Sequence, residues 1–308
     1  MATTKNTESF KGQDWPLLTP YQQGLFETMA EVGATDPNDR KNALISQALM
    51  LCPLPFRRTT ERQVVQETRV PGGSITTIIT ALDDKILLPY GLDSFVLDAI
   101  SSEARRRKNP VITTENLAEL MRLLNLDDMG GEDYKRFLAR IQRIGAFAMR
   151  VKRRGVLAIN ARIVDVDGSE FWSRQDVKRE KSGERKVIPG VVKLSDEYFA
   201  DLMHRYASIP LAILDAVSSN PTIYSTAKWL WWRADVAESE TLIPWDELAN
   251  ERGSKDSNTQ RFKAKVRTTL ALIGPARPEV ARLFKVSPKG LRVTPLDAVP
   301  SLAENPVG

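Results

Sequence analysis

Apolar residues recur at helical spacing along most of the chain, and this periodicity predicts a largely helical protein. The spacing predicts long helices over residues 93–107, 114–124, 132–150, 221–235 and 257–273, with shorter ones near Ser195 and Ile209 and over 244–253. A further helix is predicted over 36–52, with Asp36 as its cap and Pro37 at its first position. The chain up to about residue 35 is polar, and we expect it to be mobile as far as Trp15.

Runs rich in β-forming residues flank turn signals in three places. "RQVVQETRV" and "SITTIITAL" are separated by "PGG" and predict a first hairpin. "VLAINARIVDV" and "SEFWSRQDV" predict a second hairpin across Asp167 and Gly168. "EVARLFKV" and "LRVTPL", on either side of "PKG", predict a third. The charged stretch "KREKSGERK" (178–186) is typical of an exposed loop or wing tip.

Both halves of the chain therefore have the order helix, short helix, turn, long helix, β-hairpin. This order predicts an α+β, mainly helical fold with two tandem winged helix-turn-helix domains whose wings are β-hairpins. A chain of 308 residues with 42% hydrophobic content can bury two cores of ordinary size. The expected division is a partly disordered N-terminal extension with one helix, two winged-helix domains and a flexible tail, over residues 1–55, 56–192, 193–298 and 299–308.

The helix predicted over 132–150 separates apolar from basic residues when about 100° is allotted to each residue. Its apolar arc contains Tyr134, Phe137, Leu138, Ile141, Ile144 and Ala148, and the opposite arc contains Arg136, Arg140, Arg143 and Arg150. A solvated face normally mixes charges of both signs, whereas this arc carries Arg without a paired acid, although Phe147 interrupts it. The arc is either a solvated face or a surface on which Arg136, Arg140 and Arg143 bind DNA phosphate, and we predict the second.

The helix predicted over 257–273 has a narrow apolar stripe and a basic outer face. Phe262, Val266, Leu270 and Ile273 align, which leaves outward Gln260, Arg261, Ala264, Lys265, Arg267 and Thr268. Such a face suits a DNA major groove, because Arg pairs with guanine, Gln pairs with adenine, and small side chains allow close approach. Lys255 and Asn258 in the preceding turn, and Lys289 and Arg292 near the hairpin tip, are further predicted DNA contacts. The alternative is an ordinary amphipathic helix with a basic outer face.

Three tryptophans, Trp229, Trp231 and Trp232, lie within four positions of the stretch "WLWW". On a helix they and Leu230 point in four directions, and a helix that is apolar all round is usually buried. A base-stacking platform would instead need its rings on one accessible face with basic residues between them. We predict that the tryptophans form a core, with base stacking or an exposed tryptophan at a protein interface as the alternatives.

The remaining composition argues against catalysis. Lys and Arg number 44 against 39 Asp and Glu, and the net charge of +5 suits a polyanionic partner without establishing one. Cys52 and His204 are the only residues of their kinds, which excludes an intrachain disulfide and argues against a Cys/His zinc site or a paired-histidine nuclease. The sequence contains no G-x-x-x-x-G-K-[ST] loop, and adjacent acids such as those at 83–84 and 127–128 point apart. We therefore expect no catalytic residue, no metal and no cofactor.

The sequence shows neither a signal peptide nor a membrane-spanning stretch. The N-terminus lacks the layout of a signal peptide, and no stretch approaches the roughly 20 apolar residues that span a bilayer. We therefore expect a cytoplasmic protein without a membrane partner.

Three stretches resemble the RepA-type plasmid replication initiators: "LPYGLDSFVLDAISSEARRR", "VVKLSDEYFADLM", and "SIPLAILDAVSSNPTIYSTAKWLWWRADVAESETLIPWDELANERG" with the basic helix that follows it. The resemblance covers about residues 86–275. It implies two winged-helix domains that bind direct repeats of double-stranded DNA at a plasmid origin, a homodimer formed through the first domain, and recruitment of host replication proteins, namely the helicase or its loader, or the host initiator. It also supports the helix over 257–273 as the main reader of DNA.

Two other functions remain open at this point. A winged-helix transcriptional repressor without an initiator role would bind DNA through the same physics. A nuclease or primase with an unrecognised site is the alternative from the enzyme class. Short direct repeats beside the coding region would favour initiation, and a single palindrome would favour repression.

Overall fold

The computed structural model describes residues 20–36, 38–70, 73–124, 131–153, 156–164, 190–252, 254 and 259–295. The chain forms two compact units, a central unit of Ala43–Ser208 and a terminal unit that combines Met1–Asn42 with Ile209–Gly308. These bounds differ from the expected domain ranges of 56–192 and 193–298. Helix α7 (Asp196–His204) belongs to the central unit, and helix α1 (Pro20–Ala34) belongs to the terminal unit.

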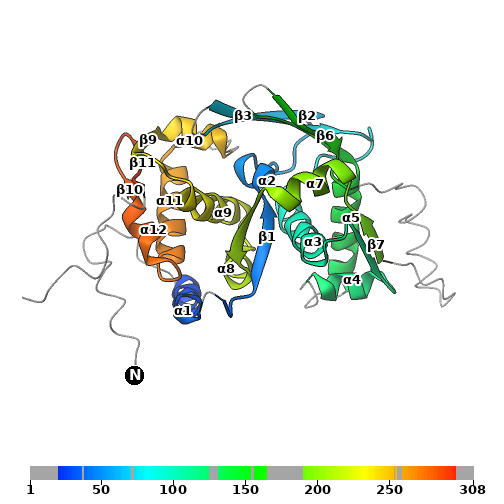
Figure 1. The fold of residues 1–308 in the computed structure, drawn as a ribbon, viewed down its shortest axis with the longest axis horizontal. Helices are drawn as coiled ribbons and strands as arrows, with labels where there is room; N and C mark the ends of the chain where they lie inside the picture. Colours follow the sequence, from blue (N-terminus) through cyan, green and yellow to red (C-terminus); the bar gives the residue numbers. More distant parts are fainter. Residues whose placement is uncertain are drawn as a thin grey trace, which may run out of the picture. The chain divides into compact units, whose positions relative to one another are not determined.

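The central unit is built on a four-stranded antiparallel sheet in the order β2-β3-β5-β6. Its strands are β2 (Gln63–Val70), β3 (Gly73–Ala81), β5 (Phe147–Arg153) and β6 (Val156–Arg162). Helices α3 (Asp93–Arg107), α5 (Gly131–Gly145) and α7 lie on the same side of this sheet (Figure 1). The predicted first hairpin is confirmed by the pairing of β2 with β3.

Two smaller sheets complete the strand pairing described for this part of the chain. Strand β4 (Val111–Thr114) pairs with β7 (Gly190–Lys193), and β1 (Asn42–Ser46) pairs with β8 (Tyr206–Pro210). The short helices α2 (Gln47–Leu51) and α4 (Leu117–Leu123) follow β1 and β4. The helix predicted over 114–124 begins only at Leu117, because the Asn116 side chain caps it by accepting the hydrogen bond from the Glu119 backbone N–H.

Two predicted helices differ from the structure. The helix predicted over 36–52 is confirmed only for α2, because residues 42–46 form β1, in which Ala43 and Ile45 are buried. The helix predicted over 132–150 ends at Gly145, and Phe147 begins β5. In "FAMRV" buried residues alternate with more exposed ones, so pairing with β3 leaves one face of the strand buried. Strand β6 therefore pairs with β5, and the predicted partner "SEFWSRQDV" lies outside the described residues.

The terminal unit combines helices with a three-stranded antiparallel sheet in the order β10-β11-β9. Its elements after β8 are α8 (Leu211–Val217), α9 (Pro221–Asp235), β9 (Thr241–Pro244), α10 (Trp245–Glu251), α11 (Thr259–Ile273), α12 (Pro278–Leu283), β10 (Phe284–Val286) and β11 (Gly290–Val293). The predicted helices near residues 209, 221 and 257 are confirmed. "EVARL" is helical, so the hairpin predicted from "EVARLFKV" begins only at Phe284.

Helix α9 forms the core of the terminal unit. It begins where the Asn220 side chain accepts hydrogen bonds from two backbone N–H groups of the first turn. Trp229, Trp231 and Trp232 are 2%, 7% and 6% exposed, and the Trp229 ring lies 6.3 Å from that of Phe284. Lys228 and Arg233, the basic residues of this helix, are buried as well. The prediction that the tryptophans form a core is confirmed.

Helix α1 was not predicted, and it packs against α8 and α11 of the terminal unit. Met29 is fully buried in this contact. A Cβ atom added to Gly33 would lie 2.3 Å from the backbone oxygen of Pro275, so only glycine allows this close approach. Gly24, in the same helix, faces open space.

Candidate nucleic-acid interface

Helix α11 presents one buried face and one exposed face. Phe262 and Val266 are fully buried and Leu270 is 1% exposed, which fixes the helix on the core of the terminal unit. The structure brings the six predicted contact residues of this helix together on its other side, where Gln260, Arg261, Ala264 and Arg267 are exposed and Lys265 and Thr268 are half-buried. At about 100° per residue, Ala264 lies at the centre of the exposed face between the two arginines.

The two arginines of this face have unused hydrogen-bond donors. Neither Arg261 nor Arg267 makes a hydrogen bond or an ion pair with any described residue. A guanidinium group offers five N–H donors in a fixed planar arrangement that matches a guanine edge or a phosphate. The small Ala264 between them allows a close approach of the helix backbone to another surface.

The turn between β10 and β11 is held against α10 and α11. The Trp245 indole N–H donates to the Ser287 carbonyl oxygen over 2.9 Å, and the Lys263 ammonium donates to the Pro288 carbonyl oxygen over 3.4 Å. The same ammonium lies 5.4 Å from the centre of the Trp245 ring. These contacts place the exposed Lys289 beside the N-terminal half of α11. Trp245 and Lys263 were missed in the sequence, because their partners are carbonyl groups far along the chain.

Gly290 fixes the approach of this hairpin to the rest of its sheet. A Cβ atom there would lie 2.2 Å from the Ile243 backbone oxygen, so β11 reaches β9 only with glycine at this position. Arg292 on β11 forms an ion pair with Glu240. The prediction of Arg292 as a DNA contact did not include this acidic partner. The predicted contacts Lys255 and Asn258 lie outside the described residues.

The arginines of α5 are placed differently from those of α11. Two N–H groups of Arg143 donate to the two carboxylate oxygens of Asp93 over 2.7 and 2.8 Å, and Arg140 Nε lies 3.9 Å from the same carboxylate. Asp93 is 1% exposed, whereas both arginine side chains are 17% exposed. The expectation that this face carries Arg without a paired acid is therefore wrong for Arg140 and Arg143.

The environment of Arg143 keeps it charged. Burial alone lowers the pKa of its guanidinium, but the hydrogen bond and the negative charge of Asp93 outweigh burial, and the pKa is raised. Its guanidinium also lies 4.7 Å from the centre of the Tyr90 ring. Of the four arginines in the predicted basic arc, Arg136 is exposed on α5, and Arg150 lies on β5 instead of the helix.

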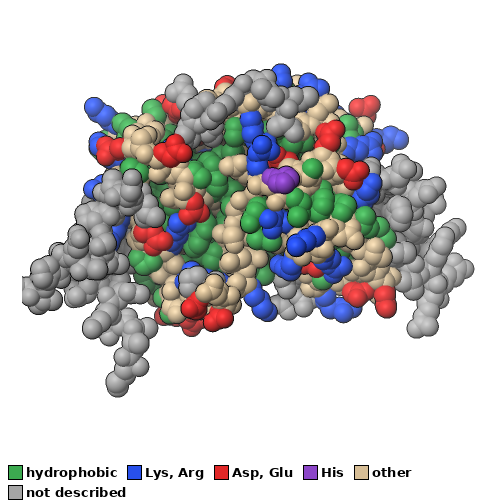
Figure 2. All heavy atoms as spheres, viewed as in Figure 1, with side chains coloured by type: hydrophobic (Ala, Val, Ile, Leu, Met, Phe, Trp, Pro, Cys, Tyr) green, Lys and Arg blue, Asp and Glu red, His purple; other side chains and the backbone are tan. Residues whose placement is uncertain are grey.

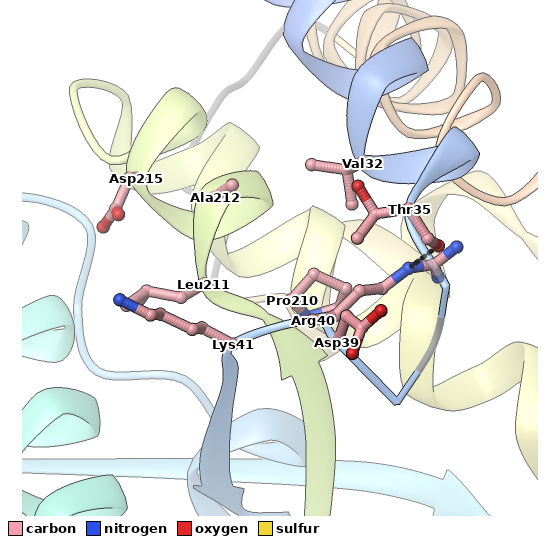
Figure 3. Close-up of a pocket in the computed structure, with 9 residues that line it drawn as sticks. All are labelled: Val32, Thr35, Asp39, Arg40, Lys41, Pro210, Leu211, Ala212 and Asp215. Carbon is pink, nitrogen blue, oxygen red and sulfur yellow. Dashed lines mark hydrogen bonds between the residues drawn. The ribbon is translucent and has the colours of Figure 1, made fainter.

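A pocket of about 280 Å³ lies in the terminal unit between the end of α1 and the start of α8 (Figure 3). Asp215 and Lys41 lie on one side of it, and Arg40 and Asp39 lie on the other. The Arg40 guanidinium is occupied, because it donates to the carbonyl oxygens of Thr35 and Gly33 over 3.0 and 3.1 Å. Desolvation raises the pKa of Asp215 to about 6. These mixed charges give no reason to assign a ligand.

Three further features that could indicate a function are a metal site, a membrane-spanning helix and a surface of one charge. No cluster of His, Cys, Asp and Glu among them could hold a metal ion, and none of their helices is long and apolar enough to cross a membrane. On the face drawn in Figure 2, basic and acidic side chains are interspersed, so net charge alone identifies no binding surface.

Two solved structures are similar to this chain. No protein-family model matches the chain, and no curated protein matches it. Among solved structures, the chain is similar to domains 2–3 of RctB, with 12% identity and a TM-score of 0.42 over 77% of this chain and 83% of that chain. It is also similar to selenomethionine derivatives of domain 2 and domain 3 of RctB, with 12% identity and a TM-score of 0.41 over 73% of this chain and 84% of that chain. At these TM-scores the likeness carries no argument about function.

Proposed function

We propose that the chain is a non-enzymatic, sequence-specific binder of double-stranded DNA that reads its target with α11. The observation that carries the proposal is the exposed face on which Arg261 and Arg267, without a partner among the described residues, flank the small Ala264. A major groove about 12 Å wide admits an α-helix, and Arg discriminates guanine there through two hydrogen bonds.

The order of elements in the terminal unit supports a winged helix-turn-helix. Helices α9, α10 and α11 are followed by the short helix α12 and then by the β10–β11 hairpin, and β9 completes the sheet beside β11. In this arrangement the last helix enters the groove and the hairpin forms the wing. The central unit repeats the order with α3, α4, α5 and the β5–β6 hairpin, although its β4 pairs with β7.

We infer initiation of plasmid replication as the biological role of this binding. The inference rests on the sequence resemblance to RepA-type initiators over about residues 86–275. It implies direct repeats at a plasmid origin as the DNA target, host replication proteins as partners, and a homodimer in one state of the protein. A repressor that uses the same units is the alternative.

Footprinting on DNA that flanks the coding region tests the binding proposal. Loss of a base-reading arginine in Arg261→Ala or Arg267→Ala should cost about 1–3 kcal/mol and relax specificity at one base position. Lys289→Ala should weaken binding to all sequences alike and lower the salt dependence by about one contact. Arg58→Ala, an exposed arginine in a loop of the central unit, is the control and should change neither quantity. Undiminished specific binding by both α11 variants would remove this helix as the reader.

Replication itself distinguishes the two roles. A plasmid whose only origin is the flanking DNA should be maintained with the unmodified chain and lost with the double variant Arg261→Ala, Arg267→Ala. The alternative outcome is that the double variant no longer binds DNA and the plasmid is still maintained, while the promoter on the flanking DNA is no longer repressed. That result would favour the repressor.

A further inference from the structure

Three basic side chains gather on one face of the central sheet. In the register of the sheet, Arg150 of β5 lies opposite Asn160 of β6, and Ala148 lies opposite Arg162. Residues two apart on a strand share a face, so Lys152, Arg150 and Arg162 are on the same side. Neighbours along a strand and across a diagonal are each about 7 Å apart in such a sheet. The three cations therefore form a short row across β5 and β6, which we call the basic row.

The face that carries the basic row is covered by no helix among the described residues of the central unit. Phe147, Met149 and Val151 point to the opposite side and are at most 1% exposed, and α3, α5 and α7 lie on that side (Figure 1). Arg150, Lys152 and Arg162 are exposed. The neighbouring outward positions of β3 are neutral, and they include Thr76 and Thr80.

Acidic residues lie only at the margins of the basic row among the described positions of the sheet. Glu67 is on β2, two strands from β5, and Glu197 accepts a hydrogen bond from the Asn160 backbone N–H over 3.2 Å. The surface around the three cations therefore keeps a positive potential, which attracts a polyanion.

Arg150 is oriented for an external acceptor. Its Nε donates to the Asn160 side-chain oxygen over 3.0 Å, and its two terminal nitrogens have no partner among the described residues. Lys152 likewise makes no hydrogen bond or ion pair with a described residue. An arginine held through Nε loses less side-chain freedom when its terminal nitrogens bind, and a phosphate group matches those two donors.

We propose that the basic row is a second DNA-binding surface that contacts the phosphate backbone without reading sequence. This inference rests on the proposed function as a DNA-binding protein, and it transfers the phosphate contacts predicted for α5 to the sheet. Evenly spaced cations on a flat face suit the regular charges of a duplex, because one phosphate follows another along each strand. Protein interfaces are commonly anchored by Trp and Tyr as well as Arg, and the described outward positions of β5 and β6 carry no aromatic side chain.

The salt dependence of binding to a duplex of unrelated sequence tests the proposal in the full chain. Each phosphate contact contributes about 0.9 to the slope of log K against log salt concentration. The triple variant Arg150→Gln, Lys152→Gln, Arg162→Gln should therefore lower the slope by about 2 to 3. The control variant Arg58→Gln, Lys85→Gln, Lys108→Gln removes the same charge from exposed positions outside the row and should leave the slope nearly unchanged. Equal slopes for the two triple variants would overturn the proposal.

Two further measurements separate the explanations. The double variant Arg150→Lys, Arg162→Lys keeps the charges and should keep the slope. The melting temperature of the triple variant shows whether that variant is folded, because an unfolded variant would have a lower one. If the triple variant binds DNA normally but loses a protein partner, the basic row is a protein-binding surface and the proposal is wrong. If the unmodified chain binds no duplex at all, the proposed function itself fails. The α11 variants could lose specific binding while the triple variant keeps the slope of log K against log salt concentration. In that case only the proposal for the basic row is wrong.

Discussion

The buried carboxylate of Asp93 allows a direct test of whether α5 uses its arginines for stability or for DNA. Arg143→Met removes the guanidinium that donates two hydrogen bonds to Asp93 but keeps most of the apolar volume of the side chain. If Arg143 serves the fold, the variant should be less stable and bind DNA normally when folded.

The size of the effect follows from burial. Asp93 is 1% exposed and also accepts a hydrogen bond from the Tyr90 backbone N–H over 2.9 Å. Breaking a buried ion pair costs about 3–5 kcal/mol, because one charge is left without its partner. Arg143 is 17% exposed and Arg140 remains 3.9 Å from the carboxylate, so we expect the lower end, about 3 kcal/mol. For a unit of this size the melting temperature should fall by about 6–12 °C.

Denaturant unfolding and DNA binding, measured on the same variants, show whether Arg143 stabilises the fold or binds DNA. Arg58→Met changes an exposed arginine in a loop of the same unit and should shift the unfolding free energy by at most about 0.5 kcal/mol. The double variant Asp93→Asn, Arg143→Met should recover part of the loss, because it leaves no buried charge. Unchanged stability of Arg143→Met, together with weaker binding to all DNA sequences and a salt slope lower by about 0.9, would refute the reasoning and restore Arg143 as a phosphate contact.

Five other substitutions have defined outcomes. Gly33→Ala should raise amide hydrogen exchange across α1, because the added Cβ atom meets a backbone oxygen at 2.3 Å, whereas Gly24→Ala adds an atom in open space and should slow it. Gly290→Ala should lower the melting temperature and weaken DNA binding, because the added atom meets a backbone oxygen at 2.2 Å. Trp229→Ala should cost about 3–5 kcal/mol in denaturant unfolding, and a small loss would contradict its place in the core. Asp215 has a pKa raised to about 6, so stability should fall as pH rises from about 4 to 6, and Asp215→Asn should abolish this fall in a pH series.

Local signals in the sequence were enough to predict the elements whose ends are set by their own residues. Helix α9 begins at the predicted Pro221 because the Asn220 side chain caps it and proline suits the first helical position. Helix α11 follows from a stripe whose members Phe262 and Val266 are both fully buried. In each case the information lies within a few residues of the element.

The failed predictions depend on pairing with distant parts of the chain. "FAMRV" is compatible with a continued α5, but β3, more than sixty residues earlier, supplies the partner that makes it a strand. Residues 42–46 likewise form a strand because β8 lies beside them, although their composition suits a helix. Helix α1 carries a weak amphipathic pattern and is fixed by tertiary contacts such as the buried Met29.

Two helices with basic residues, α5 and α11, present different side chains to solvent. Helices α5 and α11 both contain 15 residues, and their thirteenth residues are Arg143 and Ala271. Ala271 is 6% exposed and the Arg143 side chain is 17% exposed, so protein covers most of each of these two positions. The sixth residues, Arg136 and Ala264, are both exposed. The small Ala264 would let α11 approach base edges, whereas the long Arg136 would keep α5 farther from them, which agrees with the proposal that α11 reads the DNA sequence.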